Sequence, residues 1–174
     1  MTDTVCRVLL MACLLSCLTS SPVAAQDRSH GRAVHHRNHL GLFAGAATEF
    51  ADHTSTTFAA GADYERRLSQ RIGVGVMVDL TFGELKRNGL AVAGIFLHPA
   101  RGWRLFGGAG VEFVDTAAAG TSGGSSSKSH VALRLATAYD FPVGRFLVGP
   151  IVAVDLLGET ETILSYGLTI GLGF

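Results

Sequence analysis

The feature that most constrains the fold is a strict alternation of apolar residues with small or polar ones. In residues 72–82, IGVGVMVDLTF, apolar side chains occupy every second position, and Gly, Asp and Thr fill most of the positions between them. Successive side chains of a β-strand point to opposite faces, so this period of two indicates a strand with two different faces. Residues 163–174 continue the pattern up to Phe174. The chain is therefore expected to be all-β.

Seven of eight candidate segments show this alternation, and the eighth, 90–97, is apolar on both faces, so its parity is uncertain. Most segments are about 10 residues long, the length that a tilted strand needs to cross a bilayer. Short turns (LSQR, HPARG and PVG) alternate with more polar connections (ADHTS, GELKRNG, DTAAAGTSGGSSSKS and GETE), as is typical of transmembrane barrels. We predict an eight-stranded antiparallel up-and-down transmembrane β-barrel. The expected strands are 40–50, 56–67, 72–82, 90–97, 103–113, 130–141, 146–156 and 163–174.

The second face of these strands is rich in Gly, Ala and Thr and carries most of the strand charges. A charge that faces lipid at mid-depth costs ~2–4 kcal/mol for Arg or Lys, so we assign the charged residues to the interior. The prediction is a polar network centred on Arg134 that blocks the lumen to solutes. The alternative is that these are solvated strand charges near the barrel ends. The network is expected to contain Arg134, Glu112, Asp79 and Asp155, and a second layer nearer the tight turns Asp63, Glu65, Arg67, Arg104, Asp140 and Arg145.

The aromatic residues separate towards the two ends of the predicted strands. Such separation is typical of the two aromatic girdles of a membrane barrel, whereas a soluble core would place aromatic residues in mid-strand. Only Phe43 and Phe106 are assigned to the interior. The girdle at the loop end is expected to hold Phe50, Phe58, Phe82 and Phe113, and the girdle at the turn end Tyr64, Phe96, Trp103, Tyr139, Phe141, Phe146 and Phe174.

Pro150 interrupts one of these strands. Proline cannot donate a hydrogen bond to a neighbouring strand, and a closed barrel has no free edge at which this loss would be harmless. We therefore expect a bulge or a locally broken ladder at Pro150.

The N-terminal segment has the pattern of an export signal. Arg7 precedes the apolar run VLLMACLLSCL, which is too short for a transmembrane helix, and VAA supplies small residues for cleavage before Gln26. We predict a signal peptide at 1–25, a flexible periplasmic tail at 26–39 and a barrel at 40–174. All three cysteines lie in the signal, and LLSC ending at Cys17 leaves lipidation as an alternative.

The balanced charge argues against nucleic-acid binding, because the formal net charge is zero and basic residues are not gathered on one segment. The tail contains a histidine cluster, and histidine is the commonest metal ligand. The tail offers no cysteine and no carboxylate beyond Asp27, so we interpret it as polar and assign no metal site. The cluster comprises His30, His35, His36 and His39.

Two stretches, AGADYERRLSQRIGVGVMVDLTF and the terminal YGLTIGLGF, resemble the small eight-stranded outer-membrane barrels of Gram-negative bacteria (the OmpA membrane domain, OmpX and opacity-type proteins). The resemblance covers residues 40–174. It implies an outer-membrane monomer with periplasmic termini, in contact with lipid and lipopolysaccharide and delivered by periplasmic chaperones to the barrel-assembly machinery. That machinery is taken to read the last strand, which places the assembly signal at Tyr166, Leu168, Ile170, Leu172 and Phe174.

The resemblance implies no particular activity. We expect a structural, surface-interaction or limited-permeation role, with no enzymatic activity, catalytic residue or cofactor. One alternative is a lipid A-modifying barrel enzyme, for which His130, after SSSK and Ser129, and Glu112 on the adjacent strand are the best candidates. A second alternative is a soluble, lipocalin-like periplasmic carrier of an apolar ligand.

Overall fold

The computed structural model describes residues 37–50, 54–82, 86–116, 126–158 and 161–174. The predicted signal peptide and nearly all of the predicted tail lie outside these residues. None of the described residues forms a helix that is long and apolar enough to cross a membrane. Within the described part the secondary structure consists of strands joined by turns, as the alternation predicts.

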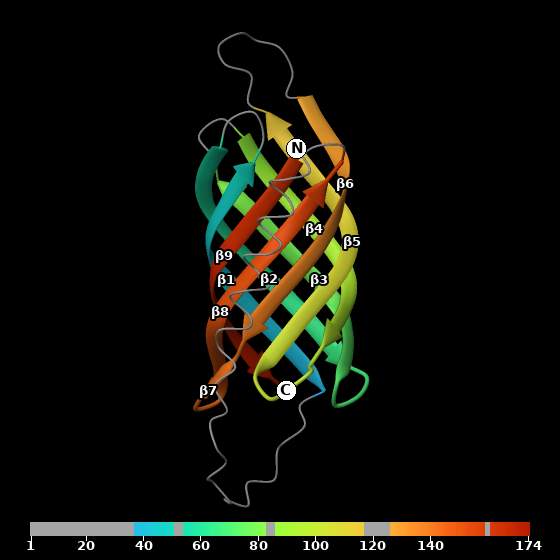
Figure 1. Ribbon diagram of the computed structural model, residues 1–174, viewed down its shortest axis with the longest axis vertical. Coiled ribbons are helices and arrows are strands. Elements are labelled where there is room, and N and C mark those ends of the chain that lie inside the picture. Colours follow the sequence, from blue (N-terminus) through green and yellow to red (C-terminus); the bar gives the residue numbers. More distant parts are fainter. Residues whose placement is uncertain (1–36, 51–53, 83–85, 117–125, 159–160) are drawn as a thin grey trace, which may run out of the picture. The chain divides into compact units, whose positions relative to one another are not determined.

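The strands form one antiparallel sheet that closes on itself (Figure 1). Consecutive strands pair with each other, except that β6 pairs with β8 and not with the short β7. β1 pairs with both β2 and β9, which closes the sheet. The eight-stranded barrel prediction is therefore confirmed. The strands are β1 (Asn38–Phe50), β2 (Thr54–Arg67), β3 (Ile72–Phe82), β4 (Lys86–Leu97), β5 (Trp103–Thr116), β6 (Ser126–Tyr139), β7 (Phe141–Val143), β8 (Phe146–Leu157) and β9 (Glu161–Gly173).

β6 and β7 together make one of the eight barrel strands, and the break between them lies opposite Pro150. Ala138 of β6 pairs with Ile151, and Phe141 of β7 pairs with Val148, so the register is the same on both sides of the break. Asp140 instead donates its backbone N–H to the carbonyl of Gly102, at 2.7 Å. The ladder is thus locally broken without an inserted residue, because Pro150 has no N–H to donate.

The strands are tilted relative to the barrel axis, as the register shows. A path that steps from partner to partner around the barrel leaves β1 at His39 and returns to β1 at Glu49. This stagger accompanies the tilt that a closed sheet requires. It also brings residues from distant strands to the same height inside the barrel.

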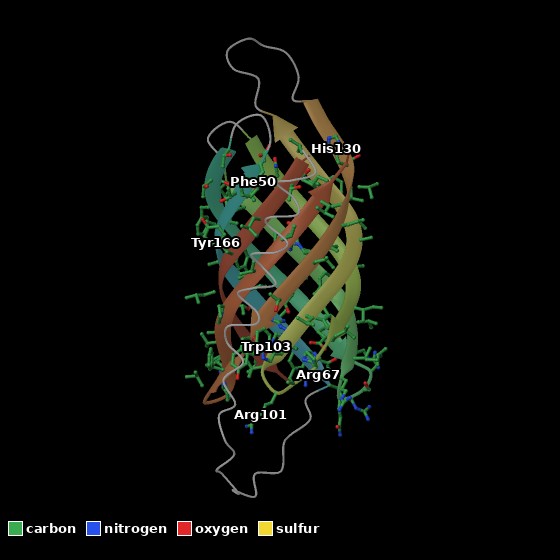
Figure 2. All side chains as sticks on the ribbon, viewed as in Figure 1. Phe50, Arg67, Arg101, Trp103, His130 and Tyr166 are labelled. Carbon is green, nitrogen blue, oxygen red and sulfur yellow. The ribbon has the colours of Figure 1, made fainter. Side chains whose placement is uncertain are left out.

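The tight turns and both ends of the folded chain lie at one end of the barrel, which we call the turn end. Asn38 and Phe174 exchange backbone hydrogen bonds there, at 2.9 Å each. The opposite end, the loop end, is where the strands lead into residues 51–53, 83–85, 117–125 and 159–160, which lie outside the described residues. Figure 2 shows Phe50 and His130 towards the loop end and Trp103 and Arg101 at the turn end.

The two surfaces of the barrel wall differ in kind. Large apolar side chains cover the exterior, with Leu42 57 %, Leu135 59 % and Leu168 63 % exposed. Most charged strand residues with the opposite parity are buried inside, including Arg134 and Asp155 at 2 % and 1 % exposure. The barrel is therefore apolar outside and polar inside.

The aromatic residues follow the predicted separation except at Phe96. Phe58, Phe82 and Phe113 are exposed near the loop end, whereas Trp103, Tyr139 and Phe141 form a chain of edge-on ring contacts near the turn end. Phe96 was assigned to the outer girdle, and this assignment is wrong. Its side chain is only 1 % exposed, because even-numbered residues of β4 face inward. The segment is apolar on both faces, so its alternation did not define the parity.

Candidate functional site in the barrel interior

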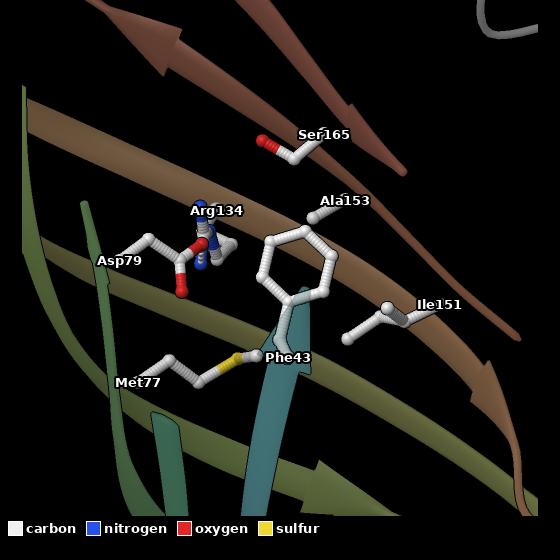
Figure 3. A pocket seen from close by; sticks show the side chains of 7 residues that line it. All are labelled: Phe43, Met77, Asp79, Arg134, Ile151, Ala153 and Ser165. Atoms are coloured by element: carbon white, nitrogen blue, oxygen red, sulfur yellow. Dashed lines mark hydrogen bonds and ion pairs between the residues drawn. The ribbon is translucent and has the colours of Figure 1, made fainter. Parts of the chain in front are cut away.

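Arg134 lies at the centre of a buried ion-pair cluster. Its Nε and Nη2 donate to the two carboxylate oxygens of Asp155 at 2.6 and 2.7 Å, and its Nη1 donates to Asp79 at 2.5 Å. The paired contact with Asp155 is the bidentate geometry that the planar guanidinium favours. The three side chains come from β6, β8 and β3, so this Arg134 cluster connects opposite parts of the wall. Figure 3 shows Asp79 beside Arg134.

Small residues on neighbouring strands make space for these buried acids. Gly61 is the β2 partner of Asp79, and a Cβ at Gly61 would overlap the Asp79 carboxylate. Gly41 has the same relation to Asp63. The glycines that interrupt the apolar alternation therefore supply room for charged side chains in a narrow lumen.

Glu112 is buried at the loop side of the Arg134 cluster. Its carboxylate accepts a hydrogen bond from the Asn88 side chain at 3.1 Å. Glu112 and Arg134 line the same cavity, which has a volume of ≈ 20 Å³. A second cavity beside Arg134, bordered by Phe43 and Met77, has ≈ 10 Å³ (Figure 3). A cavity needs about 10–15 Å³ to hold one water molecule, so each of the two cavities accommodates roughly one water.

An apolar layer lies between the Arg134 cluster and the turn end. Phe96 and Phe106 pack with ring centroids 4.7 Å apart, and both are almost fully buried. On the turn side, the Arg104 guanidinium lies over the Phe96 ring, 5.9 Å from its centroid. Apolar neighbours lower the local dielectric, which strengthens the ion pairs on either side and raises the cost of an unpaired charge.

Arg104 anchors a second cluster nearer the turn end. Its Nη1 donates to Asp63 at 2.5 Å and lies 3.2 Å from Nδ1 of His39, while its Nε is 3.4 Å from Asp140. His39 is in turn 3.3 Å from Asp63. All four side chains are buried, so this Arg104 cluster also crosses the interior.

A third group, the His98 cluster, surrounds Glu65, which is 0 % exposed. Nε2 of His98 is 2.7 Å from Glu65, and Nε of Arg67 is 3.6 Å from the same carboxylate. Arg67 is partly exposed and also lies 3.4 Å from Nδ1 of His98. The cluster closes the turn end of the interior beneath the β4–β5 turn.

Apart from Arg145, the predicted Arg134 network and second layer both lie inside the barrel, and the second layer divides between the Arg104 cluster and the His98 cluster. Asp79 and Asp155 contact Arg134, whereas Asp140 contacts Arg104. The inward assignment of Arg145 is wrong. Its side chain is exposed in the β7–β8 turn and lies over the ring of Phe146, because a turn residue is not held to the strand parity.

Sequence reasoning missed two histidines that belong to these clusters. His39 was assigned to the tail and His98 to a turn, yet β1 already begins at Asn38. His39 shares its parity with Gly41 and Phe43, both of which face inward. Extending the first strand by one residue would have placed His39 in the interior.

The residues of the predicted assembly signal lie on β9 and at its end. Tyr166, Leu168 and Ile170 are exposed on the outer surface, Leu172 is half-buried and Phe174 is 57 % exposed. The intervening Thr169 and Gly171 face the interior and are buried.

The described residues do not bring a serine and a histidine together as a hydrolase requires. His130 is the register partner of Glu112, as the enzyme alternative needs. Ser129 precedes His130 on the strand and therefore points to the opposite face of the wall. The side chains of residues 126–128 lie outside the described part.

Comparisons with known proteins find similarity in fold only. No protein-family model matches the chain, and no curated protein matches it. Among solved structures, Ail of Yersinia pestis, crystallised with a heparin analogue, shares 17 % identity and a TM-score of 0.59 over 79 % of this chain and 97 % of Ail. The Neisserial surface protein NspA has 10 % identity and a TM-score of 0.60 over 79 % of this chain and 97 % of NspA.

The N-terminal barrel domain of Pseudomonas aeruginosa OprF gives 13 % identity and a TM-score of 0.54 over 80 % of this chain and 99 % of that domain. The chain has the fold of the small eight-stranded outer-membrane barrels. Their identities to this chain are only 10–17 %, so the shared fold carries no residue-level role over to it.

Proposed function

We propose that the protein is a monomeric outer-membrane β-barrel with a structural or surface-interaction role and very limited permeation through its lumen. The observation that carries the proposal is the distribution of residues across the barrel wall. Leucines, valines and phenylalanines are exposed on the outside, and ion pairs are buried inside. Apolar patches larger than a few hundred Å² are rare on soluble monomers and mark a membrane or partner surface. The two aromatic zones fit the interfaces of a bilayer.

The filled interior supports a lumen that is closed to solutes. Arg134, Arg104 and the phenylalanines between them occupy the cross-section, and the cavities beside Arg134 are of single-water size. The same observations disfavour a soluble carrier, which needs a ligand cavity inside and a polar surface outside. The predicted export signal and the shared fold support an outer-membrane location with both termini at the periplasmic side.

Fractionation and detergent-dependent folding of residues 26–174 test this proposal. The protein is expected in the outer-membrane fraction, and its unheated, detergent-extracted form is expected to migrate differently on a gel from the heated form. A mature protein that stayed soluble and folded without detergent would contradict the membrane location.

Vesicles containing the folded barrel should release small sugars no faster than protein-free vesicles, and rapid release would contradict a closed lumen.

Recognition of the last strand by the assembly machinery is part of the proposal and has its own test. Replacing Phe174 by Ser is expected to lower the amount of folded barrel in cells while leaving refolding of the purified chain in detergent nearly unchanged. The control is Phe113→Ser, which makes the same change at an exposed phenylalanine outside the last strand. Equal losses in cells and in detergent would assign Phe174 a stability role instead.

Mass analysis of lipid A with and without the protein tests the enzyme alternative, and we expect no difference.

A further inference from the structure

Five exposed arginines gather at the turn end of the barrel. They come from separate segments: the residue before β1, the end of β2, and the β2–β3, β4–β5 and β7–β8 turns. Figure 2 shows one of them, Arg101, projecting past the end of the barrel next to Trp103. We call this set the arginine collar; it comprises Arg37, Arg66, Arg71, Arg101 and Arg145.

The exposed charge at the turn end is predominantly positive. The acidic side chains described there, Asp63, Glu65 and Asp140, are buried and belong to the interior clusters. Apart from the terminal carboxylate of Phe174, the described part of the chain therefore presents only basic charge on this rim. Within that part, no collar arginine has an ion-pair partner.

The segments that carry the collar are tied together through their backbones. The carbonyl of Arg37 accepts a hydrogen bond from Arg67, and that of Arg71 accepts one from His98, both at 2.8 Å. The carbonyl of Gly102, next to Arg101, accepts the N–H of Asp140. Such links hold the bases of the arginine side chains at fixed spacings, which reduces the ordering cost of binding a ligand.

Each collar arginine in the turns or on β2 stands beside an exposed or half-buried apolar or aromatic residue. Arg66 follows Tyr64 on the outer face, Arg71 precedes Ile72, and Arg101 is two residues from Trp103. The guanidinium of Arg145 lies 5.2 Å from the ring centroid of Phe146. Aromatic side chains sit at the headgroup level of a bilayer, so guanidinium groups beside and beyond them reach the level of the lipid phosphates.

The residue type also favours phosphate as the ligand. Every exposed basic residue described at the turn end is an arginine. Both lysines of the chain, Lys86 and Lys128, lie instead near the loop-side starts of β4 and β6. The planar guanidinium binds phosphate through two parallel hydrogen bonds, and an ammonium group acts only as a point charge.

We propose that the arginine collar binds the phosphate groups of anionic phospholipids in the leaflet that surrounds the turn end. This inference rests on the proposed membrane location. The collar selects negatively charged lipids at that leaflet and thereby sets the depth and orientation of the barrel.

The fluorescence of Trp103 tests this proposal, because Trp103 is the only tryptophan of the chain and lies at the collar. Residues 26–174 are folded into phosphatidylcholine vesicles that contain either brominated phosphatidylglycerol or brominated phosphatidylcholine as quencher. Quenching of Trp103 then reports which lipid is enriched at the turn end. We expect a preference of about fivefold or more for phosphatidylglycerol, the factor that one basic side chain near an anionic surface supplies.

Two triple variants with equal charge changes make the test specific. Arg71→Gln, Arg101→Gln and Arg145→Gln together are expected to abolish the preference. Lys86→Gln, Arg87→Gln and Lys128→Gln together remove the same charge from the loop-side starts of β4 and β6 and are expected to retain it. None of the six substituted residues is a member of the three interior clusters, and the heated and unheated gel migration of each variant verifies folding.

Equal quenching by the two lipids in the unmodified protein would overturn the proposal and leave the collar to a partner outside the membrane. Equal loss in both triple variants would also overturn it, because the effect would then be one of net charge. Failure of the proposed membrane location looks different. In that case neither brominated lipid quenches Trp103, and heating does not change gel migration.

Discussion

Leu133 and Arg134 are neighbours on β6, and they show how the two faces of the wall differ. Leu133 is 54 % exposed on the outer surface, whereas Arg134 is 2 % exposed inside and makes three hydrogen bonds to carboxylates. In a soluble barrel the leucine would face the core and the arginine would face water. The comparison teaches that each face is stable only because of what adjoins it: lipid for Leu133 in our proposal, and two aspartates for Arg134.

The largest expected effect comes from breaking the inner face. Arg134→Leu leaves Asp79 and Asp155 buried without their cation, and removing one partner of a buried ion pair costs about 3–5 kcal/mol. Urea unfolding in lipid vesicles, followed by gel migration, measures this loss. The matched variant, with Asp79→Leu and Asp155→Leu added, is expected to regain most of the stability. If the triple variant were as unstable as Arg134→Leu, side-chain packing and not charge pairing would explain the loss.

The corresponding change on the outer face is Leu133→Arg. A charge facing the middle of a bilayer costs about 2–4 kcal/mol, and one near the interface costs about 0–1 kcal/mol. The control is therefore Val143→Arg, which adds the same charge to an exposed position at the turn end. We expect the first variant to be clearly destabilised in vesicles and the second to be nearly neutral. Similar values for the two would argue against a bilayer around the barrel.

A smaller effect distinguishes the two interior arginines. Arg104→Gln removes a charged donor from Asp63 and Asp140, a loss of about 1.5–3 kcal/mol. It should cost less than Arg134→Leu because His39 remains 3.3 Å from the Asp63 carboxylate. Unfolding curves of the two variants measured in the same vesicles make the comparison. Adding His39→Gln to Arg104→Gln should enlarge the loss, and a purely additive result would show that His39 does not compensate.

The smallest effect concerns glycines on the two faces. A methyl group at Gly61 would meet the Asp79 carboxylate and a backbone carbonyl, so Gly61→Ala is expected to cost about 1–3 kcal/mol through overpacking. A Cβ at Gly89 would make an ordinary contact with Leu80 at 3.5 Å, so Gly89→Ala should be nearly neutral. Equal stability of the two variants in urea would mean that the interior has more free space than its cavities indicate.

Much of the fold could be predicted because the evidence for it is periodic. Alternation placed seven of the eight barrel strands, an apolar run between two turn sequences placed the other, and Pro150 indicated where one ladder is interrupted. The predictions failed where parity carries no information. Phe96 lies in a segment that is apolar on both faces, and Arg145 lies in a turn. His39 was missed because the end of a strand carries too few residues to establish a period.

By itself the sequence determined which face of the wall most strand residues occupy, because a period of two depends only on local backbone geometry. Only the tertiary structure decided which residues meet. Arg134 contacts Asp155 on the adjacent β8 and Asp79 on the distant β3, and Arg104 contacts Asp63, because the stagger of the closed barrel sets their heights. The tertiary structure also decided the arginine collar. Its members are scattered along the chain and lie at one rim because the barrel brings the turns and both ends of the folded chain there.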